Sequence, residues 1–134
     1  MSTVFSKIIE GDIPSYKVAE DDLFYAFLDI RPLKRGHTLV VPKEEIDYFF
    51  DVGDDLMSKY ILFAKRVAKA IEKVVPCKRI GVSVIGLEVP HSHIHLIPID
   101  GVHDMNFAND PVEMDEPEMT KLAKSINEVY NKLN

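Results

Sequence analysis

The sequence predicts an α+β fold: a five-stranded antiparallel sheet with a long central helix and a C-terminal helix. Five β-rich segments are separated mainly by short turns, which favours antiparallel pairing of strands. Two longer segments carry apolar residues at helical spacing, so each can cover part of the sheet. The 134 residues, of which 46% are hydrophobic and 28% charged, suit one domain over residues 1–134.

The first third of the chain predicts a short helix followed by three strands. The run VFSKIIEG, residues 4–11, has apolar residues at helical spacing and ends in glycine. Residues 16–20 alternate, an acidic turn follows them, and residues 24–30 are rich in β-formers. The segment HTLVVP, residues 37–42, is a third strand, which the proline at its end stops.

Residues 54–75 are the clearest helix of the sequence. Asp54 or Asp55 can cap its start, and Pro76 ends it. Its apolar stripe steps by four and three residues through Leu56, Tyr60, Phe63, Val67, Ile71 and Val74. One continuous stripe of this kind predicts a helix that packs on a sheet.

The last part of the chain predicts two strands and a terminal helix. Residues 79–85 alternate, and residues 91–99 contain three histidines at alternate positions. Asp115, followed three residues later by Glu118, is a typical helix start. Apolar residues at helical spacing then continue to Leu133.

Charge and composition exclude several classes of function. The net charge of −6 and the pI near 5.3 argue against a nucleic-acid partner, whose binding surface is normally basic. Cys77 is the only cysteine, which excludes an internal disulfide and a cysteine-rich zinc site. No apolar run approaches the roughly 18 residues of a membrane helix. Charged residues come too early for a signal peptide, so we expect a cytoplasmic protein without a membrane partner.

Three histidines, His91, His93 and His95, are the most unusual feature of the sequence. Side chains two residues apart in a strand share a face, so the three rings are expected to lie together. His37 opens the third predicted strand and joins them if the two strands are neighbours, whereas His103 is expected at the surface. The residues alone leave three interpretations open: a polar surface strand, a metal site, or nucleotidyl transfer by a histidine nucleophile.

The stretch HSHIHLI, residues 91–97, resembles the signature of the histidine triad (HIT) nucleotide hydrolases and transferases. That signature alternates three histidines with apolar residues, and Ser92 takes one of the apolar positions. Residues 4–43 also follow the N-terminal half of the family almost without gaps, and the similarity returns at residues 89–98. The resemblance implies the same α+β fold and a homodimer whose two sheets join edge to edge.

The resemblance also implies roles for four histidines. His93 would attack the α-phosphorus of a nucleotide and form a covalent nucleotidyl-histidine, which water then hydrolyses. His95 would donate to the phosphate oxygens or to the bridging atom, and His91 would orient the nucleophile. His37 would complete the cluster from the neighbouring strand.

A nucleotide pocket is implied as well. Asp29 matches the carboxylate that accepts hydrogen bonds from the ribose hydroxyls, as a ribose-binding acid should. The positions around the base are matched by Phe5, Ile8, Phe27, Ile30 and Leu39. Without the resemblance, Phe5, Ile8 and Phe27 would be expected in the core.

Two departures from the family pattern concern the phosphate and a metal. Leu87 stands where relatives carry a polar side chain that donates to the phosphate or the leaving group, and Ser83, Glu88 or Ser92 are candidate substitutes. Some relatives hold zinc through N-terminal cysteines. Ser6 stands at such a position, so we expect no metal and no other cofactor.

The expected function is that of a phosphohydrolase or nucleotidyl transferase with a small-molecule nucleotide substrate. It would act on the α-phosphate of purine nucleoside phosphoramidates, dinucleoside polyphosphates or acyl adenylates. The altered loop before His91 keeps a second interpretation open, a non-catalytic nucleotide-binding sensor. A metal-binding protein is the third.

Overall fold

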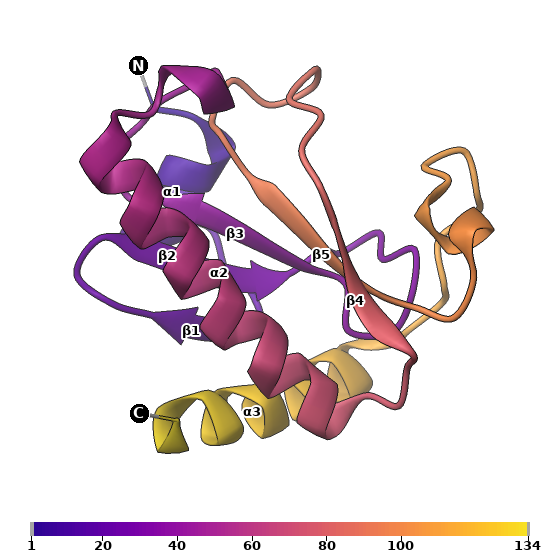
Figure 1. Ribbon diagram of the computed structural model, residues 1–134. Coiled ribbons are helices and arrows are strands. Elements are labelled where there is room, and N and C mark those ends of the chain that lie inside the picture. The colour runs from indigo at the N-terminus through magenta and orange to yellow at the C-terminus, as the bar shows by residue number, and fades with distance from the viewer. Residues whose placement is uncertain (1, 134) are drawn as a thin grey trace.

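A five-stranded antiparallel sheet forms the centre of the computed structural model, which describes residues 2–133 (Figure 1). The strands lie in the order β1-β2-β3-β5-β4 across the sheet. Their bounds are β1 Lys17–Glu20, β2 Phe24–Leu28, β3 Thr38–Pro42, β4 Arg79–Ser83 and β5 Ile94–Ile99. The helices are α1 Val4–Glu10, α2 Asp54–Val74 and α3 Glu116–Lys132, with the short 3-10 helices η1 Phe49–Asp51 and η2 Val102–Met105. The α+β fold expected from the sequence is confirmed.

The two long helices begin in different ways. Asp115 caps α3 as predicted, because its side chain accepts a hydrogen bond from the backbone N–H three residues later. The predicted cap of α2 is wrong: Gly53 is its N-cap, and no side chain caps it. Asp54 and Asp55 instead occupy the first turn, where negative charge is favourable at the positive end of the helix dipole.

The strand that carries the histidines is shorter than the predicted residues 91–99. β5 begins at Ile94, because the backbone N–H groups of His91 and Ser92 bond outside the sheet, to the carbonyls of Val89 and Ile46. The first two histidines of the triplet therefore lie in the segment that leads into the strand. Only the third is part of the sheet.

The other four strands are also one or two residues shorter than predicted, and β1 begins at Lys17. β2 ends at Leu28, β3 begins at Thr38 and β4 ends at Ser83. The N–H of Asp29 still donates to the carbonyl of His37 over 2.9 Å, so the two chains separate only beyond this pair. Asp29 and His37 therefore lie side by side at the end of the β2–β3 ladder.

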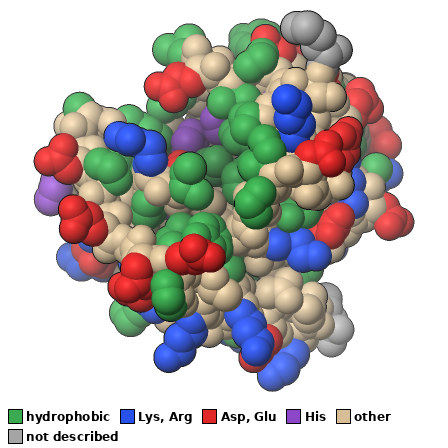
Figure 2. Space-filling model, turned by 180° about the vertical axis from the view of Figure 1, so that it is seen from behind, with side chains coloured by type: hydrophobic (Ala, Val, Ile, Leu, Met, Phe, Trp, Pro, Cys, Tyr) green, Lys and Arg blue, Asp and Glu red, His purple; other side chains and the backbone are tan. Residues whose placement is uncertain are grey.

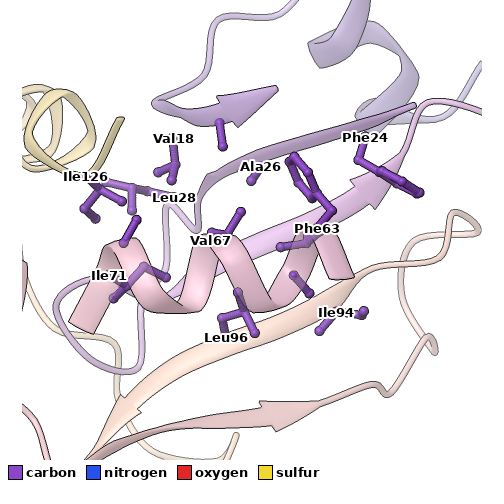
Figure 3. Packing of buried hydrophobic residues seen from close by; sticks show 14 of the residues in the cluster. Val18, Phe24, Ala26, Leu28, Phe63, Val67, Ile71, Ile94, Leu96 and Ile126 are labelled. Carbon is purple, nitrogen blue, oxygen red and sulfur yellow. The ribbon is translucent and has the colours of Figure 1, made fainter. Parts of the chain in front are cut away.

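The sheet has a different apolar cluster on each face. α2 and α3 cover one face, where Figure 3 shows buried side chains that include Phe63, Val67 and Leu96. A smaller cluster on the other face contains Phe5 of α1 and Phe27 of β2. Alternate residues of β2 belong to the two clusters, as the pleat of a strand requires. Within residues 2–133, no helix is both long enough and apolar enough to span a membrane.

Candidate active site

Four of the five histidines come together beneath one cleft. His37, His91, His93 and His95 are each at most 8% exposed, and β3 pairs directly with β5. The cleft has a volume of about 430 Å³, and three of the four rings line it. Figure 2 shows histidine atoms at the bottom of a hollow on this face of the molecule. His103, by contrast, is 87% exposed, as expected from the sequence.

In its neutral form, His93 presents an unprotonated ring nitrogen at the cleft. Its Nδ1 lies 2.8 Å from the backbone carbonyl oxygen of His91. A carbonyl oxygen can only accept, so Nδ1 of His93 carries the ring proton and donates it. The other nitrogen, Nε2, then has a free lone pair, which is what a nucleophilic imidazole needs.

His91 does not line the cleft but is held from both sides behind it. Its Nε2 lies 2.8 Å from the carbonyl oxygen of Pro42 and donates to it. Its Nδ1 lies 2.8 Å from Oγ1 of Thr3 and accepts the hydroxyl proton. Burial lowers the pKa of His91, so a single proton on a neutral ring is expected near pH 7.

His95 presents the opposite polarity to the cleft. The N–H of Leu33 donates to Nδ1 of His37 over 3.0 Å, so the proton of His37 is on Nε2. That Nε2 lies 3.0 Å from Nδ1 of His95 and donates to it. The remaining proton of His95 is therefore on its own Nε2. The cleft thus contains one ring nitrogen that can attack and one ring N–H that can donate.

Both rings of the His37–His95 pair are neutral at pH 7. Burial, together with the neighbouring His95, lowers the pKa of His37 to about 3. Burial and the neighbouring His93 lower the pKa of His95 to about 4. A neutral His95 can donate a hydrogen bond to a phosphate oxygen. It cannot release that proton, because an imidazolate anion would remain.

Asp29 stands beside this pair and lines the same cleft. Its Oδ1 accepts the N–H of Arg31 over 2.9 Å, and its Oδ2 lies 3.6 Å from Nε2 of His37. Burial raises the pKa of Asp29, and the carboxylate of Glu88 contributes in the same direction. Its side chain is still 21% exposed, so a ligand in the cleft can reach the carboxylate.

Four of the five apolar residues expected around a base lie in one cluster. Phe5, Phe27 and Leu39 are buried together, and Ile8 packs against them. The ring of Phe5 meets that of His93 edge-on, with 5.0 Å between centroids. This cluster lies directly beneath the ring of His93.

Ile30 lies apart from that cluster. This residue is 77% exposed and lines two other cavities, of about 530 and 840 Å³. None of the five predicted base-contacting residues lines the 430 Å³ cleft itself. Their contact with a nucleotide therefore stays a prediction.

The residues with the best metal-binding geometry are Asp29, His37 and His95, whose ligand atoms lie within 4.8 Å of one another. Their hydrogen bonds oppose a metal. Nδ1 of His37 already accepts the N–H of Leu33, so Nε2 can bind a cation only if the ring becomes an imidazolate. The triplet is no better suited, because both nitrogens of His91 are engaged in hydrogen bonds.

The loop between β4 and His91 gives the cleft few hydrogen-bond donors. Leu87 is 88% exposed and lines the cleft, where relatives are expected to place a polar side chain. Glu88 lines it too, but a carboxylate can only accept when ionised. Arg31 is the one cation among the described residues that line the cleft.

The two serines considered as substitute donors lie elsewhere. The hydroxyl of Ser92 pairs with that of Tyr60 over 3.1 Å, and both side chains are buried in the core. Ser83 lines a second cavity of about 640 Å³, which lies on another side of His93. Neither side chain lines the cleft that holds His95.

Several side chains at the site were not anticipated, including Arg31, Leu33 and Asn109 in the lining of the cleft, and two of them contact the histidines. Phe107, in the loop after η2, has its ring centroid 4.8 Å from that of His95 and covers this ring edge-on. Nothing in the sequence around it pointed to the site. Thr3 bonds to His91, and a helix-start signal was available to find it: a threonine just before the apolar run of α1.

Comparison with known proteins identifies the family. A family model described as the HIT domain matches residues 10–102, well over half of the chain. The chain belongs to the HIT family. It is 40% identical to Protein hit of Bacillus subtilis over 108 residues, which cover 75% of this chain and 73% of that protein.

Two further HIT proteins illustrate the range of the family. The chain is 40% identical over 100 residues to the adenosine 5'-monophosphoramidase of Schizosaccharomyces pombe, covering 73% of this chain and 74% of that enzyme. A crystal structure of a Hit-like protein from Bartonella henselae matches with a TM-score of 0.81 at 29% identity, over 96% of each chain. Nucleotide hydrolysis is therefore an activity of the family to which this chain belongs.

Proposed function

We propose that this protein hydrolyses purine nucleoside 5'-phosphoramidates through a nucleotidyl intermediate on His93. The observation that carries the proposal is the opposite polarity of two cleft nitrogens, a lone pair on His93 and an N–H on His95. The lone pair attacks the α-phosphorus, and the N–H stabilises the negative charge on the phosphate oxygens. Relatives named adenosine 5'-monophosphoramidase support this choice of substrate.

The reaction takes two steps. In the first, Nε2 of His93 forms a bond to phosphorus while the bond from phosphorus to the amine nitrogen breaks, and the amine gains a proton. In the second, water forms the new P–O bond, the P–N bond to His93 breaks, and a proton returns to solvent. Because neutral His95 keeps its own proton, the additional proton of the leaving amine comes from water, either before the attack or as the P–N bond breaks.

The charges around the cleft favour an amine leaving group over a polyphosphate. A polyphosphate leaving group would share the cleft with one cation, Arg31, and with the carboxylate of Glu88, while Asp29 is assigned to the ribose. It would also face the apolar side chain of Leu87 in place of a donor. A neutral or cationic amine avoids the repulsion between like charges. Phosphoramidates are therefore preferred over acyl adenylates, and dinucleoside polyphosphates are least favoured.

The nucleoside would extend from Asp29, whose exposed carboxylate accepts the ribose hydroxyls. Ile30 follows it directly and offers a mostly exposed apolar side chain to the base. Phe5, Phe27 and Leu39 are only 4–6% exposed, so they would contribute an apolar wall on the His93 side of the site, away from Ile30. Ile8 packs against the same three residues from α1 and would complete the apolar side.

The test is turnover of adenosine 5'-phosphoramidate by the parent protein, His93→Ala and the surface control His103→Ala. We expect the parent and His103→Ala to release AMP at similar rates. Loss of the nucleophile should lower the rate on the order of 10⁴-fold, as for other covalent catalysts. Turnover by His93→Ala at the parent's rate, or no turnover by the parent, would contradict the proposal.

A non-catalytic nucleotide sensor is the second candidate. The observation in its favour is Leu87, an exposed apolar side chain that lines the cleft where relatives are expected to carry a polar donor. Calorimetry that detects AMP binding, combined with no release of product from any phosphoramidate, would select this function over hydrolysis.

We also propose that the protein forms a homodimer through β4. This strand is at one edge of the sheet, and its Val82 is 63% exposed. Tyr48 and Phe50 line the same cavity as Val82 and are 58% and 74% exposed. Two such edges can pair across a two-fold axis and cover these side chains. Sedimentation as a monomer at micromolar concentration would contradict the dimer.

The cytoplasmic location also remains a prediction.

A further inference from the structure

Hydrogen bonds connect the start of α1 to His91 of the triad. Oγ1 of Thr3 accepts the N–H of Ser6 over 3.0 Å, which caps the helix. The same oxygen lies 2.8 Å from Nδ1 of His91. Glu45, in the loop after β3, accepts the N–H of Thr3 over 2.8 Å and the hydroxyl of Ser6 over 2.9 Å.

The direction of each proton in this network can be assigned. The carboxylate of Glu45 can only accept, so the Ser6 hydroxyl donates to it. Nε2 of His91 donates to the carbonyl of Pro42, and the buried ring is neutral, so its Nδ1 can only accept. The hydroxyl of Thr3 is therefore the donor to His91.

We propose that Thr3 is a positioning residue for the reaction. Its hydroxyl holds His91 as the Nε2–H tautomer in one orientation, and the backbone carbonyl of His91 in turn holds the Nδ1–H of His93. The lone pair that His93 directs at phosphorus thus depends on a hydroxyl at the start of the N-terminal helix. The kinetic part of this inference rests on the proposed function.

The position of α1 reinforces this connection. The ring of Phe5 meets both histidines edge-on, with centroid distances of 5.8 Å to His91 and 5.0 Å to His93. Phe5 lies two residues after Thr3, in the first turn of the helix. Loss of the contact between Thr3 and His91 would therefore loosen both the ring that orients the nucleophile and the apolar wall beside it.

Three substitutions separate positioning from helix capping. Thr3→Ser keeps both the cap and the donor, whereas Thr3→Val removes both at similar volume. Thr3→Asp keeps the cap, because Asp is a good N-cap residue, but its carboxylate cannot donate to His91. We expect Thr3→Ser to match the parent. Thr3→Val and Thr3→Asp should lower kcat on adenosine 5'-phosphoramidate about tenfold with little change in KM. This is the smallest loss usually seen when a residue that orients another functional side chain is removed.

A second measurement does not depend on activity. The ¹⁵N chemical shifts of His91 report which ring nitrogen carries the proton. We expect the Nε2–H form in the parent and in Thr3→Ser. In Thr3→Asp a second proton should bind at Nδ1, where the new carboxylate accepts it, while Nε2 keeps its proton for the carbonyl of Pro42. An unchanged His91 spectrum in Thr3→Asp would overturn the inference.

The matched control is Asp115→Ala, which removes the N-cap of α3. It should lower stability as an N-cap loss does but leave kcat at the parent's value. A loss of kcat in Asp115→Ala equal to that in Thr3→Val would mean that helix capping alone explains the effect. If the parent itself shows no turnover, the proposed function fails, and the His91 spectra still decide the role of Thr3.

Discussion

The two chains of hydrogen bonds that end in the cleft differ in the backbone group from which they start. In the His91–His93 chain, a carbonyl accepts the ring proton of His93 and leaves a lone pair at the cleft. In the His37–His95 chain, the N–H of Leu33 donates to the first ring and leaves an N–H at the cleft. Identical side chains thus acquire opposite chemistry because the main chain offers an acceptor to one and a donor to the other.

The two chains also differ in their contact with solvent. The His91–His93 chain continues through Thr3 to Glu45, an exposed residue. The His37–His95 chain is buried, and both of its rings have strongly lowered pKa values. Changes in the first chain should therefore mainly affect the placement of the nucleophile. Changes in the second should affect both catalysis and stability.

After loss of His93 itself, the largest effect is expected at the donating end, in His95→Asn. Loss of a preorganised donor to a phosphate oxygen should lower kcat by about 10²–10³-fold. Because neutral His95 cannot release its proton, the loss should be the same for phosphoramidates with good and with poor leaving amines. Rates for a series of amines check this point. A loss that grows as the amine becomes more basic would show that His95 is a proton donor instead.

His37→Leu should have a smaller effect on activity and a clear effect on stability. It leaves the N–H of Leu33 and Nδ1 of His95 without partners, at a cost of about 1–3 kcal/mol for each buried group. We expect kcat to fall about tenfold, because His95 can now exchange tautomers. His37→Gln has both a donor and an acceptor and serves as the control. Urea unfolding measures the stability, and an unchanged midpoint for His37→Leu would contradict the proposed chain.

The stability of the parent should depend on pH in a defined direction. Unfolded histidines titrate near 6.5, whereas His37 and His95 have folded pKa values of about 3 and 4. Between pH 6.5 and 4 the unfolded state therefore binds protons that the native state does not. The free energy of unfolding should therefore be highest above pH 6.5 and should decrease as the pH falls through this range. His37→Gln should show a shallower loss, and equal slopes in the two proteins would contradict the lowered pKa of His37.

The smallest effect is expected for Leu87→Gln. It places an amide donor on the exposed loop where relatives are expected to have one. Turnover of phosphoramidates with basic amines should rise a few-fold, while good leaving groups should be unaffected. Leu23→Gln, on a surface away from the cleft, is the control. A fall in rate for Leu87→Gln would show that the apolar side chain is itself needed.

The helices, the strands and the convergence of the histidines could be predicted from the sequence, because they depend on the periodicity of the side chains. The strands that follow His37 and His93 pair directly, and His95 lies opposite Leu39 in their register. The protonated nitrogen of each ring could not be predicted. It depends on an N–H of Leu33 and on backbone carbonyls, which any residue type supplies.

The other errors have similar causes. β5 begins late because the N–H of Ser92 bonds to a loop carbonyl, at Ile46, that no local pattern places there. Phe107 covers His95 from a loop with no periodicity, so its position depends on tertiary packing alone. Ile30 matched a base-contacting position, but its exposure and its separation from the Phe5 cluster became clear only in three dimensions.

The most direct test of the central claim is to trap the covalent intermediate. The parent protein would be mixed with adenosine 5'-phosphoramidate, quenched in alkali within one turnover, and analysed by peptide mass spectrometry. The account predicts one AMP attached to the peptide that contains His93, and none in His93→Asn. Turnover without any adduct, or an adduct on His95 or His37, would contradict the assignment of His93 as the nucleophile.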